Sequence, residues 1–163
     1  SNRLGVDMAK KKNYNSLDEL VKDLKDDIDD VLSREVFDEV CDIEMEHIQR
    51  DVLNRYQPQI YERRSSGGIS DRSNIKGKVR DMELTVNNET PYNPGYGTYN
   101  RGNDLATLLN EGSGGKHKIY YDFAGEFEQP TYFSENTQTE IDNTNRVERI
   151  LNKGLKRRGY EIK

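Results

Sequence analysis

The sequence predicts an α+β fold, in which a long N-terminal helix or helix pair and a C-terminal helix pack on a small, mostly antiparallel sheet. Apolar residues recur at the spacing of one helix face over about residues 16–57 and again from Ser134 to Leu155. Residues 81–86 alternate between polar and apolar types, which is typical of a half-buried strand. The length of 163 residues fits one domain. Residues 1–7, which precede a Met-Ala-Lys-Lys-Lys start, are interpreted as an upstream extension or a cloning remnant.

The N-terminal helix has a clear start signal. Ser16 and Glu19 have the spacing of a capping box, in which the hydroxyl and the carboxylate satisfy free backbone N–H groups. An apolar stripe then runs from Leu17 to Tyr56, and Ser33 is a place where a second helix could begin. Pro58 disfavours helix in the residue before it, so the helix is expected to end at about residue 57.

The middle of the chain contains turns, one strand and a long loop. Ser65-Ser66-Gly67-Gly68 predicts a turn, with Gly67 and Gly68 reversing the chain at positive φ. Met82, Leu84 and Val86 supply the apolar side of the strand. Residues 87–103 are rich in proline, glycine and tyrosine and predict a loop. We expect this loop to order against a neighbouring subunit through Tyr92, Tyr96 and Tyr99, or else to fold back on its own sheet.

The second half of the chain predicts three further elements. Asp104 can cap a short helix through Leu109, and the glycines from Gly112 to Gly115 end it. Lys118 to Phe123 suits a second strand. One last helix follows from Ser134, weakened by Gly154 and ended by Gly159.

The composition predicts a small hydrophobic core. Charged residues make up 34% of the chain and hydrophobic residues 32%, so contacts between subunits are expected to supply additional burial. No apolar run approaches the roughly 18 residues of a membrane span, and no membrane role is expected. A single cysteine excludes an internal disulfide framework. The net charge of −5 argues against general nucleic-acid binding.

The charge is unevenly distributed along the sequence. Residues 16–46 contain 13 acidic and 3 basic residues, a net of −10, whereas residues 146–163 contain 7 basic and 2 acidic residues, a net of +5. These segments are either two solvated helix faces or complementary surfaces that meet between copies of the chain. The second interpretation makes Lys156, Arg157 and Arg158 interface residues.

No convergent set of nucleophile, base and stabiliser is evident, so we expect no enzymatic activity, no catalytic residues and no cofactor. Cys41 lies on the apolar stripe among acidic residues and is expected to be a buried structural cysteine rather than a nucleophile. His47 is spaced to meet Glu44 and Asp51 in a metal site, but a surface histidine among carboxylates is the preferred interpretation. No metal site is therefore predicted.

Three motifs in order resemble a known family. The first is Tyr61-Glu62-Arg63-Arg64 followed by Gly67-Gly68-Ile69, Asp71, Asn74 and Ile75; the second is Leu108-Leu109-Asn110-Glu111-Gly112; the third is Gln129-Pro130-Thr131-Tyr132-Phe133. Their order and spacing resemble the neck or tail-completion family of long-tailed double-stranded DNA bacteriophages, whose members are also called head–tail joining proteins or minor tail components. The resemblance covers about residues 10–160 and implies that residues 8–163 form one domain of this kind.

The resemblance implies a structural virion protein that forms a ring, hexameric or dodecameric, at the head–tail junction. Its expected partners are copies of itself, head-closure or portal-side proteins, and tail-tube or tail-terminator proteins. Genome DNA would pass through the channel without specific binding, and the particle would assemble in the bacterial host cytoplasm. Tyr61, Arg63 and Arg64 then become candidate interface residues, with Gly67, Gly68 and Gly112 as structural turns. The alternative function is a nucleic-acid-binding accessory protein that uses the basic C-terminal segment and the tyrosine-rich loop.

Overall fold

The fold is organised around one long helix. The computed structural model describes residues 13–55, 66–91, 105–112 and 130–161. Five consecutive helical segments make the long helix without interruption: α1 (Leu17–Val31), a π-helical segment (Leu32–Val36), α2 (Phe37–His47), a second π-helical segment (Ile48–Val52) and a 3₁₀ turn (Leu53–Arg55). At 1.5 Å per residue, the long helix measures about 58 Å. The predicted fold class is confirmed.

The start of α1 confirms the predicted capping box. Ser16 Oγ accepts a hydrogen bond from the Glu19 backbone N–H at 3.2 Å, and the Glu19 carboxylate accepts one from the Asn15 backbone N–H at 3.0 Å. No second helix begins at Ser33, because the backbone stays helical there and the Ser33 hydroxyl donates to the Asp30 carbonyl oxygen at 3.0 Å. The capping box therefore starts a single helix that runs through both predicted halves.

The sheet is a two-stranded antiparallel hairpin of β1 (Ile75–Arg80) and β2 (Glu83–Asn88). The predicted strand over residues 81–86 is thus displaced, because Asp81 and Met82 form the two-residue turn with φ of +50° and +63°. Positive φ at both central residues defines a type I′ turn, which suits the twist of a hairpin. The Met82 backbone N–H donates to Asp29 Oδ1 at 2.9 Å and ties the turn to α1. β1 was not among the strands predicted from the sequence.

The C-terminal region contains two helices where one was predicted. They are α4 (Phe133–Asn143) and α5 (Arg146–Arg157), and Thr144 between them is extended, with φ −120° and ψ 161°. The predicted short helix is present as α3 (Leu105–Glu111), and the Gly112 that follows it has φ +73°. The predicted strand over residues 118–123 lies outside the described residues.

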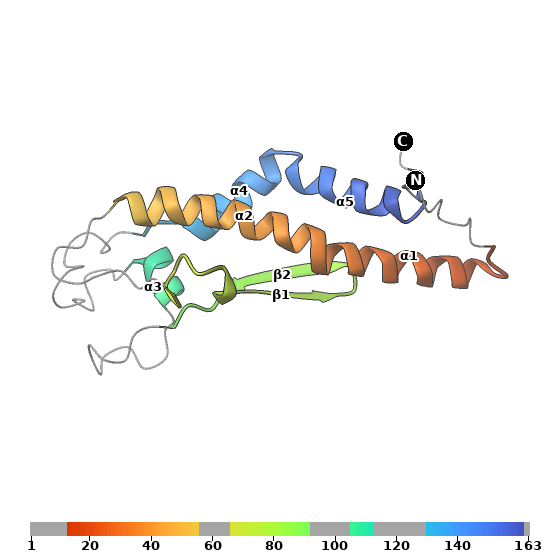
Figure 1. Ribbon diagram of the computed structural model, residues 1–163, viewed down its shortest axis with the longest axis horizontal. Coiled ribbons are helices and arrows are strands. Elements are labelled where there is room, and N and C mark those ends of the chain that lie inside the picture. The colour runs from red at the N-terminus through yellow and green to blue at the C-terminus, as the bar shows by residue number, and fades with distance from the viewer. Residues whose placement is uncertain (1–12, 56–65, 92–104, 113–129, 162–163) are drawn as a thin grey trace, which may run out of the picture.

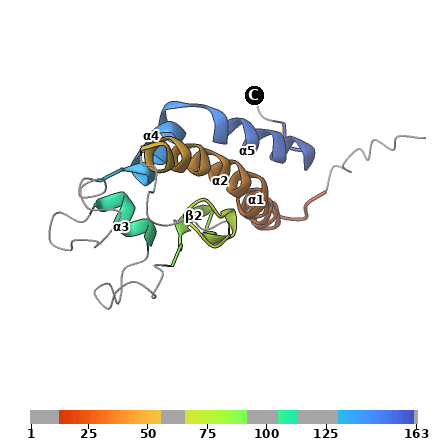
Figure 2. The ribbon, with the colours of Figure 1, turned by 60° about the vertical axis from the view of Figure 1, so that its left-hand side comes forward.

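The elements form three layers, and the long helix is the middle one. The hairpin covers one side of the long helix, and α4 and α5 cover the opposite side, as Figures 1 and 2 show. α3 lies near the C-terminal end of the long helix, on the same side as the hairpin. None of the helices in the described part of the chain is long and apolar enough to cross a membrane.

Two separate apolar clusters form along the long helix. A π-helical turn is wider than an α-helical one, so each π-helical segment changes the direction in which the apolar stripe faces. The first cluster joins the long helix to α5 and the hairpin; its buried residues are Val31, Leu32, Val36, Val40 and Leu155. The second joins the long helix to α3 and α4; its buried residues are Ile48, Val52, Ile69, Ala106, Leu109 and Phe133.

Two glycines permit the close packing of these layers. Gly77 of β1 lies under the ring of Phe37, where an added Cβ would be 2.5 Å from Phe37 Cδ2. Gly154 of α5 lies against the long helix, where an added Cβ would be 2.6 Å from Val31 Cγ1. Such distances are below van der Waals contact, so both positions require the absence of a side chain. Gly154 therefore has a packing role beyond the predicted weakening of the helix.

α5 ends in a Schellman motif. The Gly159 N–H donates to the Lys156 carbonyl at 3.0 Å, and the Tyr160 N–H donates to the Leu155 carbonyl at 3.2 Å. Gly159 has φ +94°, the left-handed conformation that this motif needs. The predicted role of Gly159 as the helix stop is confirmed.

Candidate functional site

His47 is a buried polar residue of α2, and its side chain is only 4% exposed. Its Nδ1 lies 2.9 Å from Asp51 Oδ2, one helical turn further along, and its Nε2 lies 2.7 Å from Glu140 Oε2 of α4. Arg50 Nη2 lies 2.6 Å from Nδ1. The expectation of a surface histidine is wrong, because α4 packs over this side of α2 and brings Glu140 to the ring.

The imidazole is one of the groups that lower the pKa of both carboxylates that contact it. A hydrogen bond from His47 lowers the pKa of Glu140, with Arg146 adding to the effect. Burial acts to raise the pKa of Asp51, but hydrogen bonds from His47 and Asn136 outweigh burial and hold that pKa below its usual range. The arrangement stabilises charged carboxylates and joins α2 to α4.

The described residues around His47 are not arranged as a metal centre. Glu44, the third residue of the considered site, is buried elsewhere, and burial raises the pKa of its carboxyl. Throughout the described segments, no group of three or more His, Cys, Asp or Glu side chains is arranged to hold a metal ion. Cys41 is fully buried, and burial raises the pKa of its thiol to about 11, as expected for a structural cysteine.

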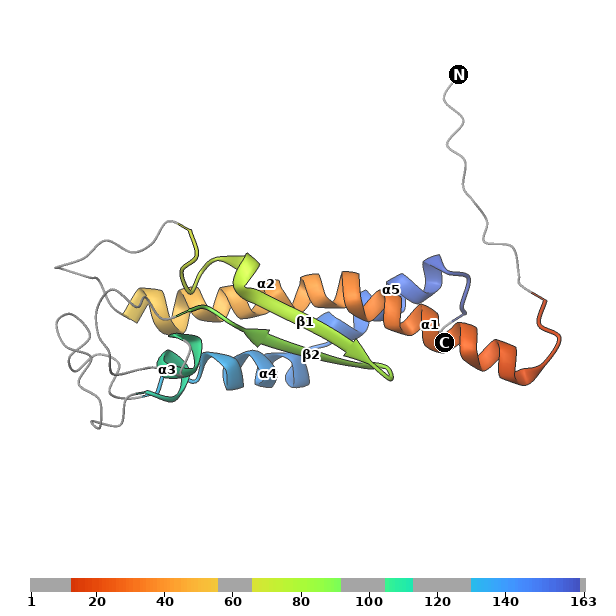
Figure 3. The same ribbon diagram turned by 90° about the horizontal axis from the view of Figure 1, so that it is seen from below.

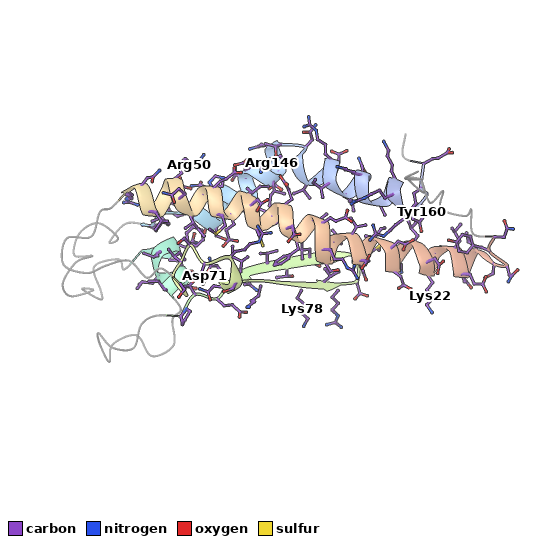
Figure 4. All side chains as sticks on the ribbon, in the orientation of Figure 1. Lys22, Arg50, Asp71, Lys78, Arg146 and Tyr160 are labelled. Atoms are coloured by element: carbon purple, nitrogen blue, oxygen red, sulfur yellow. The ribbon has the colours of Figure 1, made fainter. Side chains whose placement is uncertain are left out.

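Arg146 joins three helices at one guanidinium group. Its Nε donates to Glu39 at 2.7 Å, and its Nη1 donates to Glu46 at 3.0 Å and to Glu140 at 2.9 Å. Hydrogen bonds to Glu46 and Glu39 raise the pKa of Arg146 further. A surface groove of about 580 Å³ lies beside this group, and the labelled Arg50 and Arg146 line it (Figure 4). Each charged residue that lines the groove already has an ion-pair partner: Arg146 pairs with Glu46, Arg50 with Asp51 and Asp42 with Arg72.

The C-terminal cations also pair within the chain. Arg158 forms an ion pair with Asp30, and Arg157 forms one with Glu35. The Tyr160 hydroxyl donates to Asp27 Oδ2 at 2.7 Å. The acidic and basic segments therefore meet inside one molecule, contrary to the interpretation that they meet between copies. Lys156, the remaining member of the predicted trio, is exposed.

One end of the long helix carries an uncovered apolar surface. The N-terminal part of α1 extends past the hairpin turn, as Figures 1 and 3 show. Here Leu17 is 72% exposed, Leu20 36% and Val21 42%. We call these three residues the arm stripe. The helical period of the sequence places these three residues on one apolar face, and no described element covers that face.

A second exposed surface lies on the hairpin. The register places Lys76, Lys78 and Arg80 on the face opposite to Ile75, Gly77 and Val79, and all three cations are exposed. We call these three cations the hairpin basic face. Lys78 points away from the long helix in Figure 4. The signal in the sequence was the alternation Ile-Lys-Gly-Lys-Val-Arg, in which a glycine replaces an apolar residue.

The other predicted site residues divide into two groups. Gly67 has φ +69°, and its N–H donates to Asp71 Oδ2 at 2.6 Å, whereas the described backbone has no positive φ at Gly68. Of the glycine pair, Gly67 alone makes the reversal. The six remaining candidate interface residues lie outside the described residues: Tyr61, Arg63, Arg64, Tyr92, Tyr96 and Tyr99.

The fold and these two surfaces define a small α+β protein that is built on one long helix and has an apolar stripe exposed among the described residues. A family profile described as YomN matches residues 16–157, which is most of the chain. The chain belongs to the YomN family and is a phage-related protein. No curated protein and no solved structure matches it.

Proposed function

We propose that this protein is a structural component of the phage particle, which assembles as a ring at the head–tail junction and joins portal-side proteins to the tail. The observation that carries the proposal is the arm stripe, an apolar helix face at the end of the long helix that no described part of the chain covers. Exposed apolar residues in a row mark protein-binding surfaces, because solvent contact with them is unfavourable. The match to a phage-related family, together with the three motifs that resemble neck proteins, supports a partner within the phage particle.

The pattern of ion pairs supports a structural role. Arg146, Arg157 and Arg158 each bind carboxylates of the long helix. Such groups hold helices together and are not poised to act on a substrate. The alternative, nucleic-acid binding through the C-terminal segment, has less support because two of its three clustered cations already have acidic partners within the chain.

Deletion of the gene from the phage that encodes this chain tests the proposal. Lysates of the deletion phage should contain filled or emptied heads and separate tails, and a plasmid copy of the gene should restore joined particles. Antibody labelling of restored particles should mark the neck. Joined, infectious particles in the absence of the protein would refute the proposed function.

A further inference from the structure

We propose that neighbouring copies in the assembly bind head to tail, with the arm stripe of one copy lying on the hairpin basic face of the next. This inference rests on the proposed function and specifies the contact that builds the ring. The arm stripe is continuous with the core. Further along α1, the same helix face reaches Ile28, which packs against the first apolar cluster. Toward the N-terminus of α1 the described elements that pack on this face end, but the apolar face continues through the arm stripe.

The charged residues beside the arm stripe are mainly acidic, which favours a basic partner surface. At 100° per residue, Asp18 lies on one flank of the stripe and Asp23 on the other. Residues 17–26 contain four acidic and two basic residues, a net of −2. Two arms packed against each other would bring like charges together, which is unfavourable. The arm stripe therefore fits a surface that is cationic and can also cover apolar side chains.

The hairpin basic face has both properties. Its three cations stand in a row on one side of β1, opposite Asn87, Thr85 and Glu83 of β2. Lysine and arginine stems are aliphatic, so they can cover an apolar helix face while their charged ends reach carboxylates. Met82, at the tip of the same hairpin, is 44% exposed and adds apolar surface. The inner face of the hairpin packs on the long helix of its own chain, whereas no described element covers the outer face, where the helix of another copy can lie.

The two surfaces lie on different parts of the molecule. A contact between two unlike surfaces is heterologous, and its repetition generates a closed ring when the rotation closes and a filament when it does not. A two-fold dimer would instead use the same surface on both partners. The arm stripe and the hairpin basic face therefore suit a ring.

A charge exchange tests the contact. The hairpin variant carries Lys76→Glu and Lys78→Glu, and the arm variant carries Asp18→Lys and Asp23→Lys. Each variant alone should fail to assemble, because its arm and its hairpin then have the same sign. A 1:1 mixture should assemble in alternation, since each arm meets a hairpin of opposite sign. Light scattering after size-exclusion chromatography gives the mass of the assembly, which is compared with the 18.9 kDa of one chain. Thermal melts check that each variant is folded.

The matched control is Arg149→Glu with Lys153→Glu, which makes the same charge change on exposed positions of α5. It should assemble like the natural chain. Leu17→Ser with Val21→Ser removes the apolar part of the arm stripe without changing charge, and it should also abolish assembly. Raising the salt concentration should weaken assembly of the natural chain and of the mixture alike.

Complementation of the deletion phage separates this inference from the proposed function. Restoration of joined particles by the two variants together, but by neither alone, would support both. Joining by the hairpin variant alone would overturn the contact and leave the proposed function standing. Joined particles without any copy of the protein would overturn the function itself. Unimpaired assembly of the hairpin variant, combined with loss of salt-sensitive binding to duplex DNA, would instead assign the hairpin basic face to nucleic acid.

Discussion

Replacement of Gly154 by alanine should destabilise the protein, although the same change usually stabilises a helix. At an exposed helical position, alanine is favoured over glycine by about 1 kcal/mol. Here the new Cβ would lie 2.6 Å from Val31 Cγ1 and 2.5 Å from Glu35 Oε2. Val31 is fully buried and β-branched, so its γ-carbons have no other low-energy position. Glu35 can move only by disturbing its ion pair with Arg157.

The magnitude follows from two opposing effects. Overpacking of a core costs about 1–3 kcal/mol, and the propensity gain offsets about 1 kcal/mol of it. Disturbing the Glu35–Arg157 ion pair adds to the loss. We therefore expect Gly154→Ala to lower the free energy of unfolding by about 1 kcal/mol or more, measured by urea denaturation followed by circular dichroism.

A double-mutant cycle with Val31→Ala isolates the overlap. Val31→Ala alone removes both γ-carbons and should destabilise by leaving a cavity. In the Gly154→Ala background the same change should cost less, because the alanine Cβ occupies part of the vacated space, which gives a coupling energy of about 1 kcal/mol. A stabilising effect of Gly154→Ala, or additivity in the cycle, would refute the close packing of α5 on the long helix.

The remaining predictions concern local conformation and pH. Gly67→Ala should cost about 1 kcal/mol of unfolding free energy because of the positive φ, and Gly67→Asn should cost less because asparagine tolerates that region; equal losses would contradict this. Met82→Gly should raise the free energy of unfolding by up to about 1 kcal/mol, since methionine is strained at φ +63°; a decrease would argue against turn strain. The pKa values of Asp51 and Glu140 are lowered in the folded state. The two carboxylates therefore stabilise the fold at pH values above their unfolded-state pKa values, and this stabilisation is lost as the pH falls through their folded-state pKa values. Asp51→Asn should therefore flatten the pH dependence of stability in the acidic range, and an unchanged slope in an acid titration would exclude this role.

Elements with a strong local signal were predictable from the sequence. The long helix has a capping box and an uninterrupted apolar period, and α3 is followed by glycine. β1 was missed because Gly77 interrupts its apolar alternation, and the Asp81-Met82 turn lacks the glycine that usually marks a type I′ turn. The break between α4 and α5 has neither proline nor glycine, and its signal is the run Asn143-Thr144-Asn145, whose residue types favour helix caps and turns.

The site was less predictable than the fold, for a physical reason. Helical period tells which residues share a face, but it does not tell which other element packs on that face. His47 and Glu140 are 93 positions apart, and only the packing of α4 on α2 brings them to 2.7 Å. The same limit applies to Arg158, whose acidic partner Asp30 lies on its own chain. The exposure of the arm stripe likewise depends on where the hairpin and α5 end.

The two apolar clusters hold the long helix at a fixed length between its two ends. Each cluster fixes a different part of the helix, with α5 and the hairpin at one part and α3 and α4 at the other. A helix held at two places along its length resists bending, so the distance from the arm stripe to α3 is set by the number of residues between them. Each added residue would lengthen that distance by about 1.5 Å. In an assembly built through the arm, the span of each subunit would then be encoded in helix length.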